Sequence, residues 1–110
     1  MATRDPLDGE ALPEAVVDDL LDDGRRRRLL DVLFEADGPM AIDDVATELW
    51  ARETDTDPED VSDNERRRVR NDVFQHHLPK LTATEVVAYD SVVGTLELDD
   101  AGPVFERLRE

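Results

Sequence analysis

Apolar residues in the first half of the chain recur at the spacing of α-helices. After Pro13, which suits a first helical turn, apolar side chains return every three or four positions until Gly24, which we expect to break this helix. A second and more hydrophobic helix is predicted over residues 25–38, with Gly38 placed to end it. We expect this helix to be central to the fold, and its apolar stripe consists of Leu29, Leu30, Leu33, Phe34 and Ala36.

A third helix and an acidic connection follow. Residues 38–42 are too short for more than an edge strand, and Asp43 is placed to cap the helix after them. The inward face of that helix is expected to hold Ile42, Val45, Ala46, Leu49 and Trp50. An acidic stretch of about a dozen residues, 53–63, then predicts a long connection.

Residues 62–81 combine the clearest helix start with a basic cluster. Ser62 and Glu65 match the Ser-x-x-Glu capping box, which places the helix start just before four arginines. Pro79 lacks a backbone donor and is expected to kink or loosen the last turn. The inward face is predicted to consist of Val69, Val73, Phe74, Leu78 and Leu81.

The last third of the chain changes to the pattern of β-strands. Residues 86–90 and 94–98 are rich in β-branched and apolar side chains and predict a hairpin, and residues 102–110 predict a terminal helical turn. The order of elements predicts a mostly helical α+β fold, a winged helix-turn-helix with a C-terminal β-hairpin wing. The predicted organisation is a polar tail at 1–12, this domain at 13–100 and a C-terminal extension at 101–110.

Three segments resemble a known family: the helix start "RRRRLLDVL", the helix end "HLPKL" and the strand "VVAYD". They are similar to haloarchaeal winged-helix domains of unknown function, many of them regarded as transcriptional regulators, over about residues 15–100. The resemblance implies a winged-helix fold and, by association, DNA binding. Two features depart from compact winged helices. Glu85 stands where a glycine often closes the helix, so its turn is expected to differ, and the connection at 53–63 is unusually long.

Charge changes the picture of the surface. The chain has 29 acidic and 13 basic residues and a formal net charge of −16. Its one lysine, Lys80, stands among twelve arginines, and aspartate exceeds glutamate, which favours adaptation to a salt-rich cytoplasm. Intrinsic disorder is the alternative explanation, but the helical and strand patterns argue against it. The chain lacks cysteine, a signal-peptide pattern and an apolar run of about 20 residues, so we expect a cytoplasmic protein.

The outward face of the helix at 62–81 has the chemistry needed to read bases. Arg68, Asn71 and Gln75 follow an i, i+3, i+7 spacing, and such side chains form bidentate contacts with guanine and adenine in the major groove. Arg66 and Arg67 are assigned to phosphates. We therefore predict a transcriptional regulator that binds double-stranded DNA. We also expect a homodimer through residues 104–108 or the first helix, because one small domain would read too short a site.

Acidic neighbours leave a second hypothesis open, a protein-interaction module on a winged-helix scaffold without DNA contact. Asp72 and Glu65 are expected on the outward face, and the predicted wing tip has no basic residue. Arg66 and Arg70 are alternatively expected to pair with acidic residues of the preceding helix or connection. The block at 25–28 is expected to bridge nearby carboxylates, with phosphate contact as the alternative, and those carboxylates are Asp18, Asp19, Asp22, Asp23 and Asp31.

Other kinds of site find little support in the sequence. His76 and His77 point about 100° apart on a helix, so they do not chelate one metal; His77 is expected to pack and His76 to face solvent. Trp50 and Tyr89 are expected at the core or its edge. No nucleophile and base and no glycine-rich phosphate loop are recognisable, so we predict no enzymatic activity, cofactor, metal or small-molecule substrate.

Overall fold

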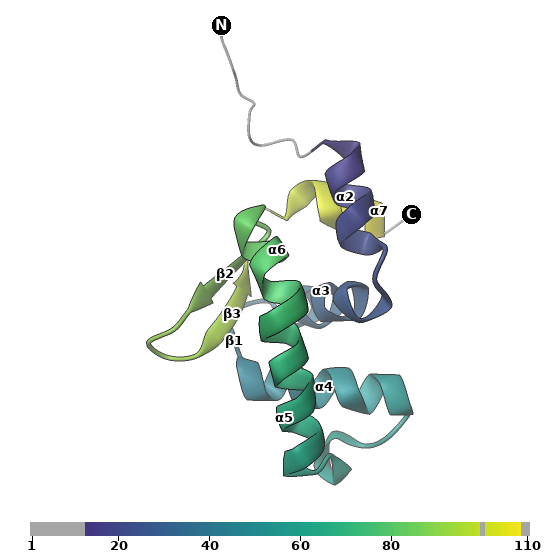
Figure 1. Cartoon of the computed structure of the whole chain (residues 1–110), viewed down its shortest axis with the longest axis vertical. Coiled ribbons are helices and arrows are strands. Elements are labelled where there is room, and N and C mark those ends of the chain that lie inside the picture. The colour runs from purple at the N-terminus through teal and green to yellow at the C-terminus, as the bar shows by residue number, and fades with distance from the viewer. Residues whose placement is uncertain (1–12, 100, 109–110) are drawn as a thin grey trace, which may run out of the picture.

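The structure, a computed structural model, describes residues 13–99 and 101–108, and the predicted tail at 1–12 lies outside them. This part of the chain is mostly helical with one small antiparallel sheet, as the sequence predicts (Figure 1). The helices are α2 (Glu14–Leu21), α3 (Gly24–Ala36), α4 (Ile42–Thr54), α5 (Asp63–Asp72), α6 (Leu78–Ala83) and α7 (Gly102–Leu108). The strands are β1 (Met40–Ala41), β2 (Val87–Asp90) and β3 (Thr95–Leu98).

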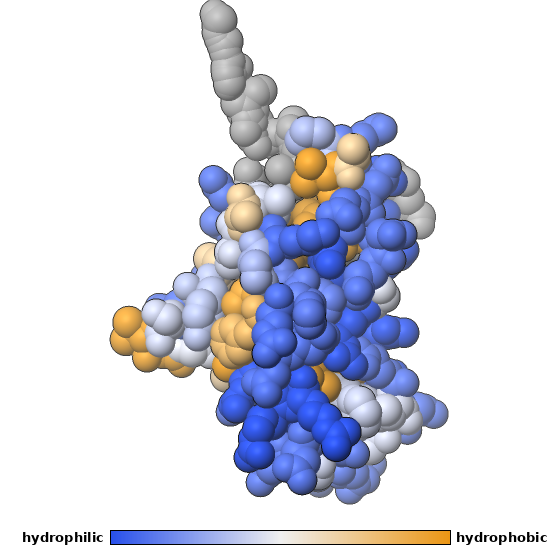
Figure 2. Space-filling view, in the orientation of Figure 1, coloured by the Kyte–Doolittle hydropathy of each residue, from blue (hydrophilic) through white to orange (hydrophobic). Residues whose placement is uncertain are grey.

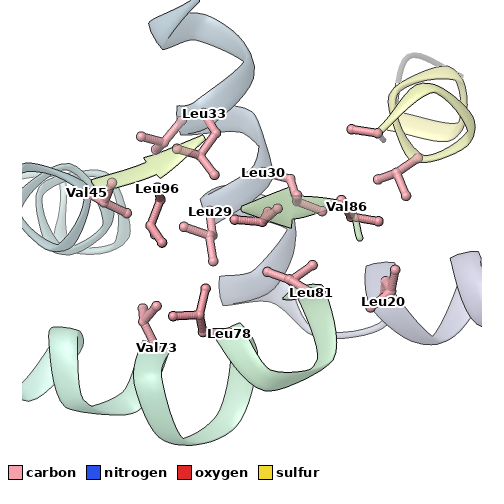
Figure 3. Close-up of a cluster of buried hydrophobic side chains, with 14 of the residues drawn as sticks. Leu20, Leu29, Leu30, Leu33, Val45, Val73, Leu78, Leu81, Val86 and Leu96 are labelled. Carbon is pink, nitrogen blue, oxygen red and sulfur yellow. The ribbon is translucent and has the colours of Figure 1, made fainter. Parts of the chain in front are cut away.

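The core forms around α3, as its hydrophobic stripe predicts, except that Ala36 is exposed and Val32, which the predicted stripe did not include, is buried. Leu29, Leu30 and Leu33 are buried where helices and strands converge (Figure 3). The inward residues predicted for the helix at 62–81 are buried too, apart from Phe74, which packs against the core while partly exposed. Trp50 likewise lies at the edge of the core. Removing such apolar area from water is the main source of stability in a chain of this size.

The boundary between α2 and α3 is sharper than the sequence predicts. Gly24 was expected to break the first helix, but it is the first residue of α3. The preceding Asp23 is the N-cap, and its Oδ1 accepts a hydrogen bond from the Arg26 amide (3.0 Å). At the other end, Asp37 takes the left-handed conformation (φ 56°) one residue before Gly38. Aspartate adopts this conformation more readily than most residues, so Asp37 ends α3 one residue before the glycine that was predicted to end it.

The sheet has the order β1-β3-β2, with both neighbours antiparallel. β1 is the predicted edge strand, and β2 and β3 form the predicted hairpin, which extends away from the helices (Figure 1). The Asp90 carboxylate accepts from the Val92 amide (2.9 Å), and Gly94 closes the turn in a left-handed conformation (φ 72°). These contacts give the hairpin tip a defined shape.

The start of α4 corrects one prediction. Asp43 lies inside the first turn, and the N-cap is Ala41, which provides no side-chain acceptor. The reason is tertiary: β1 pairs with β3, and the ladder continues in a hydrogen bond from the Ile42 amide to the Gly94 carbonyl (3.0 Å). The chain therefore enters the helix directly from the strand. At its far end α4 continues to Thr54, so the connection to α5 is shorter than predicted.

The helix predicted over residues 62–81 is three segments in line (Figure 1). Its capping box is confirmed: the Ser62 hydroxyl accepts from the Glu65 amide (3.1 Å), and the Glu65 carboxylate accepts from the Ser62 amide (3.0 Å). A π-helical segment, Val73–His77, then separates α5 from α6. Because Pro79 cannot donate, this wider turn is the loosening that the sequence predicts.

The turn after α6 is built without glycine. Glu85 adopts the left-handed conformation (φ 64°) that a glycine would favour, and the Val86 amide donates to the Leu81 carbonyl (3.0 Å). This turn directs the chain from α6 into β2. A left-handed glutamate carries a steric cost because its Cβ approaches the backbone.

The chain ends, as far as it is described, with α7 packed against α2 (Figure 1). Val104 of α7 and Leu20 of α2 are both buried in the core of the chain. Within residues 13–99 and 101–108, no helix has the length and apolar character needed to cross a membrane.

Candidate functional site

Four polar side chains project from one side of the α5 helix and the π-helical segment: Arg67, Arg68, Asn71 and Gln75. We call them the outward face. All four are exposed, and none forms a side-chain hydrogen bond or ion pair with another residue of the described ranges. Figure 2 shows strongly hydrophilic residues over this part of the molecule. Because Gln75 lies in the wider π-helical turn, its direction relative to Arg68 departs from the regular i, i+7 spacing.

Arg66, the fifth predicted site residue, is placed differently. It is half-buried, and its guanidinium donates to the Thr47 hydroxyl (2.8 Å), the Val61 carbonyl (3.4 Å) and the Asp63 carboxylate (2.6 Å). Arg70 pairs with Asp43 on α4 (2.8 Å). The alternative expectation that these two arginines pair with nearby acidic residues is therefore confirmed, although Asp63 belongs to α5 itself.

A small pocket lies between the starts of α4 and α5. It has a volume of about 180 Å³ and is lined by Asp43, Asp63, Arg66, Arg67 and Arg70. Arg67 thus belongs both to the outward face and to the rim of this pocket. Three of the five lining residues are arginines, whose guanidinium groups bind anions through charge-assisted hydrogen bonds.

Asp72 is not on the outward face, contrary to the prediction. Its carboxylate accepts from Arg25 Nη1 (2.9 Å) and lies 3.0 Å from His77 Nε2. Arg25 also makes a bidentate pair with Glu53 on α4 (2.6 and 2.7 Å). The hydrogen bonds to Glu53, and then to Asp72, raise the pKa of Arg25 above its ordinary value despite its partial burial. The expected repulsion between Asp72 and a phosphate is therefore much reduced.

The same contacts correct the prediction for residues 25–28. Arg25 joins carboxylates 28 and 47 positions away rather than the aspartates near it in sequence. Arg26 is buried and donates to the Asp19 carbonyl (3.0 Å), while Arg27 and Arg28 are exposed without an ion pair to any described residue. Packing brings α3 against α4, and Arg25 at its start reaches Asp72 of α5, which no local pattern reveals.

His77 is buried, 3 % exposed, as predicted, and His76 is exposed. Arg26 Nε donates to His77 Nδ1 (3.3 Å), so the ring proton is on Nε2, which donates to Asp72. No pattern in the sequence predicts this buried network. Its contacts connect α3 to the helical segments that carry the outward face. No cluster of three metal-binding side chains occurs within residues 13–99 and 101–108.

The hairpin tip is apolar. Val92 is 91 % exposed and Val93 66 % exposed, and they form the hydrophobic end of the hairpin in Figure 2. The lack of basic residues at the tip was predicted from the sequence. The exposure of the two valines was not, although their position in a predicted turn indicates it. Tyr89 was predicted at the core or its edge, but it is exposed (38 %), and its ring lies edge-to-face against Phe74 (ring centroids 5.5 Å apart).

Comparisons with known proteins give one match. A family described as a domain of unknown function (DUF7344) matches residues 18–97. The match extends from α2 to β3 and contains the outward face, the pocket and the buried network. No curated protein and no solved structure matches the chain.

Proposed function

The chain belongs to the DUF7344 family of domains of unknown function, and we propose that it is a DNA-binding transcriptional regulator on a winged helix-turn-helix scaffold. In this proposal α4 and α5 are the two helices of the motif and the β2–β3 hairpin is the wing. The helix that begins at Asp63 enters a major groove. Two copies bind together, because one domain of this size contacts too short a site for specificity.

The outward face is the observation that supports this function most directly. Arg68, Asn71 and Gln75 are exposed without side-chain partners in the described part of the chain, so their donors and acceptors are available to base edges. Arginine pairs with guanine, and asparagine or glutamine pairs with adenine, each through two hydrogen bonds. Arg67 and Arg66 lie beside them and are assigned to phosphates. The Asp72 carboxylate is paired with Arg25, so it repels the phosphates of DNA less than a free carboxylate would.

Salt has a specific role in the proposal. A net charge of −16 repels DNA in dilute buffer, where charges interact over tens of ångströms. At molar salt the Debye length is about 3 Å, so contact depends on the short-range bonds of the outward face. We propose that the protein acts in a salt-rich cytoplasm and binds DNA poorly in dilute buffer.

The test is a gel shift with genomic DNA fragments at about 2 M KCl, where long-range charge is screened. We expect a shift with the wild type and about a 10–100-fold weaker one with Arg67→Ala/Arg68→Ala, since a bidentate contact from Arg68 to guanine contributes roughly 1–3 kcal/mol and the loss of Arg67 removes a phosphate contact. Arg27→Ala/Arg28→Ala is the matched control, because it removes two exposed arginines elsewhere and should change binding less than about threefold. Absence of a wild-type shift, or equal loss in both variants, would reject the assignment.

One observation favours a second function, a protein-interaction module on the same scaffold. Val92 and Val93 present an apolar tip on a defined turn, with Asp90 instead of a basic residue beside it. Exposed apolar patches of this kind are typical of protein contacts. If the gel shift is absent, a partner lost on Val92→Ser/Val93→Ser and retained on Arg67→Ala/Arg68→Ala would establish this alternative.

A further inference from the structure

The pocket between α4 and α5 has an excess of positive charge in an acidic protein. Its lining contributes three arginines, Arg66, Arg67 and Arg70, and two aspartates, Asp43 and Asp63, which leaves one net positive charge. The N-terminus of α4 also lies here through Asp43, and its N-cap provides no side-chain acceptor for the first amides of the helix. Both features favour an anion in the pocket.

The arginines of this pocket have N–H donors that form no hydrogen bond with a described residue. A guanidinium offers five N–H groups. Arg66 uses three of them, for Thr47, Val61 and Asp63, and Arg70 uses one, for Asp43. Arg67 uses none on any described residue. All three side chains therefore have N–H groups available to bind an anion.

An anion can replace the two aspartates as partners of the arginines. The Asp63 side chain is 87 % exposed and the Asp43 side chain 55 % exposed, so each is solvated when released from its arginine. Exposed ion pairs of this kind contribute little to stability, so breaking them costs little. Thr47 and the Val61 carbonyl hold the Arg66 guanidinium independently of Asp63. The arginine thus keeps its position when the carboxylate leaves.

We propose that this pocket binds a backbone phosphate of DNA through Arg66, Arg67 and Arg70, and that Asp43 and Asp63 compete internally for the same guanidinium groups. The identity of the ligand rests on the proposed function. On binding, the phosphate oxygens take the positions of the two carboxylates, which turn into solvent. The aspartates therefore lower the affinity while keeping the arginines oriented in the unbound protein.

The first experiment uses inorganic phosphate and the full chain. Nε–Hε NMR signals are followed at constant ionic strength, and saturable shifts are expected at Arg66, Arg67 and Arg70 but not at Arg25, which Glu53 and Asp72 hold. Asp43→Asn/Asp63→Asn should bind phosphate about 3–10 times more tightly, and each single variant about 2–3 times. Glu106→Gln on α7, at the other end of the molecule, removes one negative charge, as each single variant does; it is their charge-matched control and should leave the phosphate affinity unchanged (Figure 1).

Lack of saturable shifts at the three arginines overturns the phosphate site, and unchanged affinity in both single variants overturns the competition.

The second experiment separates this inference from the proposed function. Arg70→Gln should weaken duplex binding about 3–10-fold and reduce the slope of log affinity against log salt by about 1. Duplex binding without any phosphate shift rejects the pocket alone. Phosphate shifts without duplex binding reject the DNA ligand and the regulator function, and leave an anion site.

Discussion

His77 connects α3 to α5 through its two ring nitrogens, which the sequence pattern around it does not predict. One ring nitrogen accepts from Arg26 of α3 and the other donates to Asp72 of α5, which Arg25 in turn connects to Glu53 of α4. Helical spacing correctly predicted that the ring would be buried. It did not predict the partners, because Arg26 lies 51 positions away and meets the ring only after α3 packs beside the π-helical segment.

The network predicts a large effect of one substitution. His77→Ala leaves a buried arginine donor without its acceptor and opens a cavity, so the free energy of unfolding should fall by about 2–4 kcal/mol. His76→Ala alters an exposed side chain and should change it by less than about 0.5 kcal/mol. Denaturant unfolding followed by circular dichroism measures both. Similar small losses would show that the buried contacts contribute little.

A second residue-scale prediction concerns Asp19 and Lys80. A hydrogen bond from Lys80 (2.8 Å) lowers the pKa of Asp19 from its ordinary value of 3.8. Since the folded-state pKa is depressed, the stabilisation by this pair is present above pH 3.8 and is lost as the pH falls through the folded value. Lys80→Met should raise the pKa of Asp19 toward 3.8 in carboxyl NMR titrations.

Glu35 provides the internal control for that titration. Its pKa is lowered from 4.5 by Arg52, not by Lys80, and should not move in Lys80→Met. An unchanged Asp19 pKa would mean that the ion pair does not persist in solution.

At the scale of elements, signals contained within a few residues predicted the structure well. The capping box of α5 and the effect of Pro79 depend on groups within one or two turns, and both were predicted correctly. The start of α4 was predicted wrongly, because Asp43 is a suitable cap only if no strand occupies the preceding residues. β1 is too short to be recognised as more than an edge strand, yet its pairing with β3 determines where the helix begins.

The turn from α6 to β2 gives a prediction at this scale. Glu85 holds a left-handed conformation that costs a residue with a Cβ about 1–2 kcal/mol. Glu85→Gly should therefore raise the free energy of unfolding by about 0.5–1 kcal/mol, the remainder being offset by the greater freedom of unfolded glycine. Glu85→Ala retains the Cβ and should leave stability nearly unchanged. Equal effects in the two variants would show that the glutamate side chain, not the backbone, matters.

At the scale of the whole molecule, charge is the dominant feature. Acidic residues exceed basic ones over most of the chain, but not at the start of α3 or along α5 and α6. Repulsion among surface carboxylates opposes the compact state and acts over about 10 Å at 0.1 M salt. Salt should therefore affect both stability and the approach to a polyanion.

We predict that thermal stability increases with KCl. Raising KCl from about 0.1 to about 2 M shortens the Debye length below about 3 Å and should raise the melting temperature by roughly 5–15 °C. Calorimetry over this range measures the change. Most of the increase is expected below about 1 M, where screening changes most. A constant or falling melting temperature would mean that ion pairs such as Arg70–Asp43 outweigh the general repulsion.

The sequence by itself determined the helices, the hairpin, the central position of α3 and the exposed side of α5, because hydrophobic periodicity and local capping act within a few residues. Only the tertiary structure decided which charges pair. Arg25 finds Glu53 and Asp72, and Arg70 finds Asp43, while Arg67 and Arg68 find no partner among the described residues. The physical reason is that ion pairing depends on distances between side chains from separate elements, and these distances exist only after the core has packed.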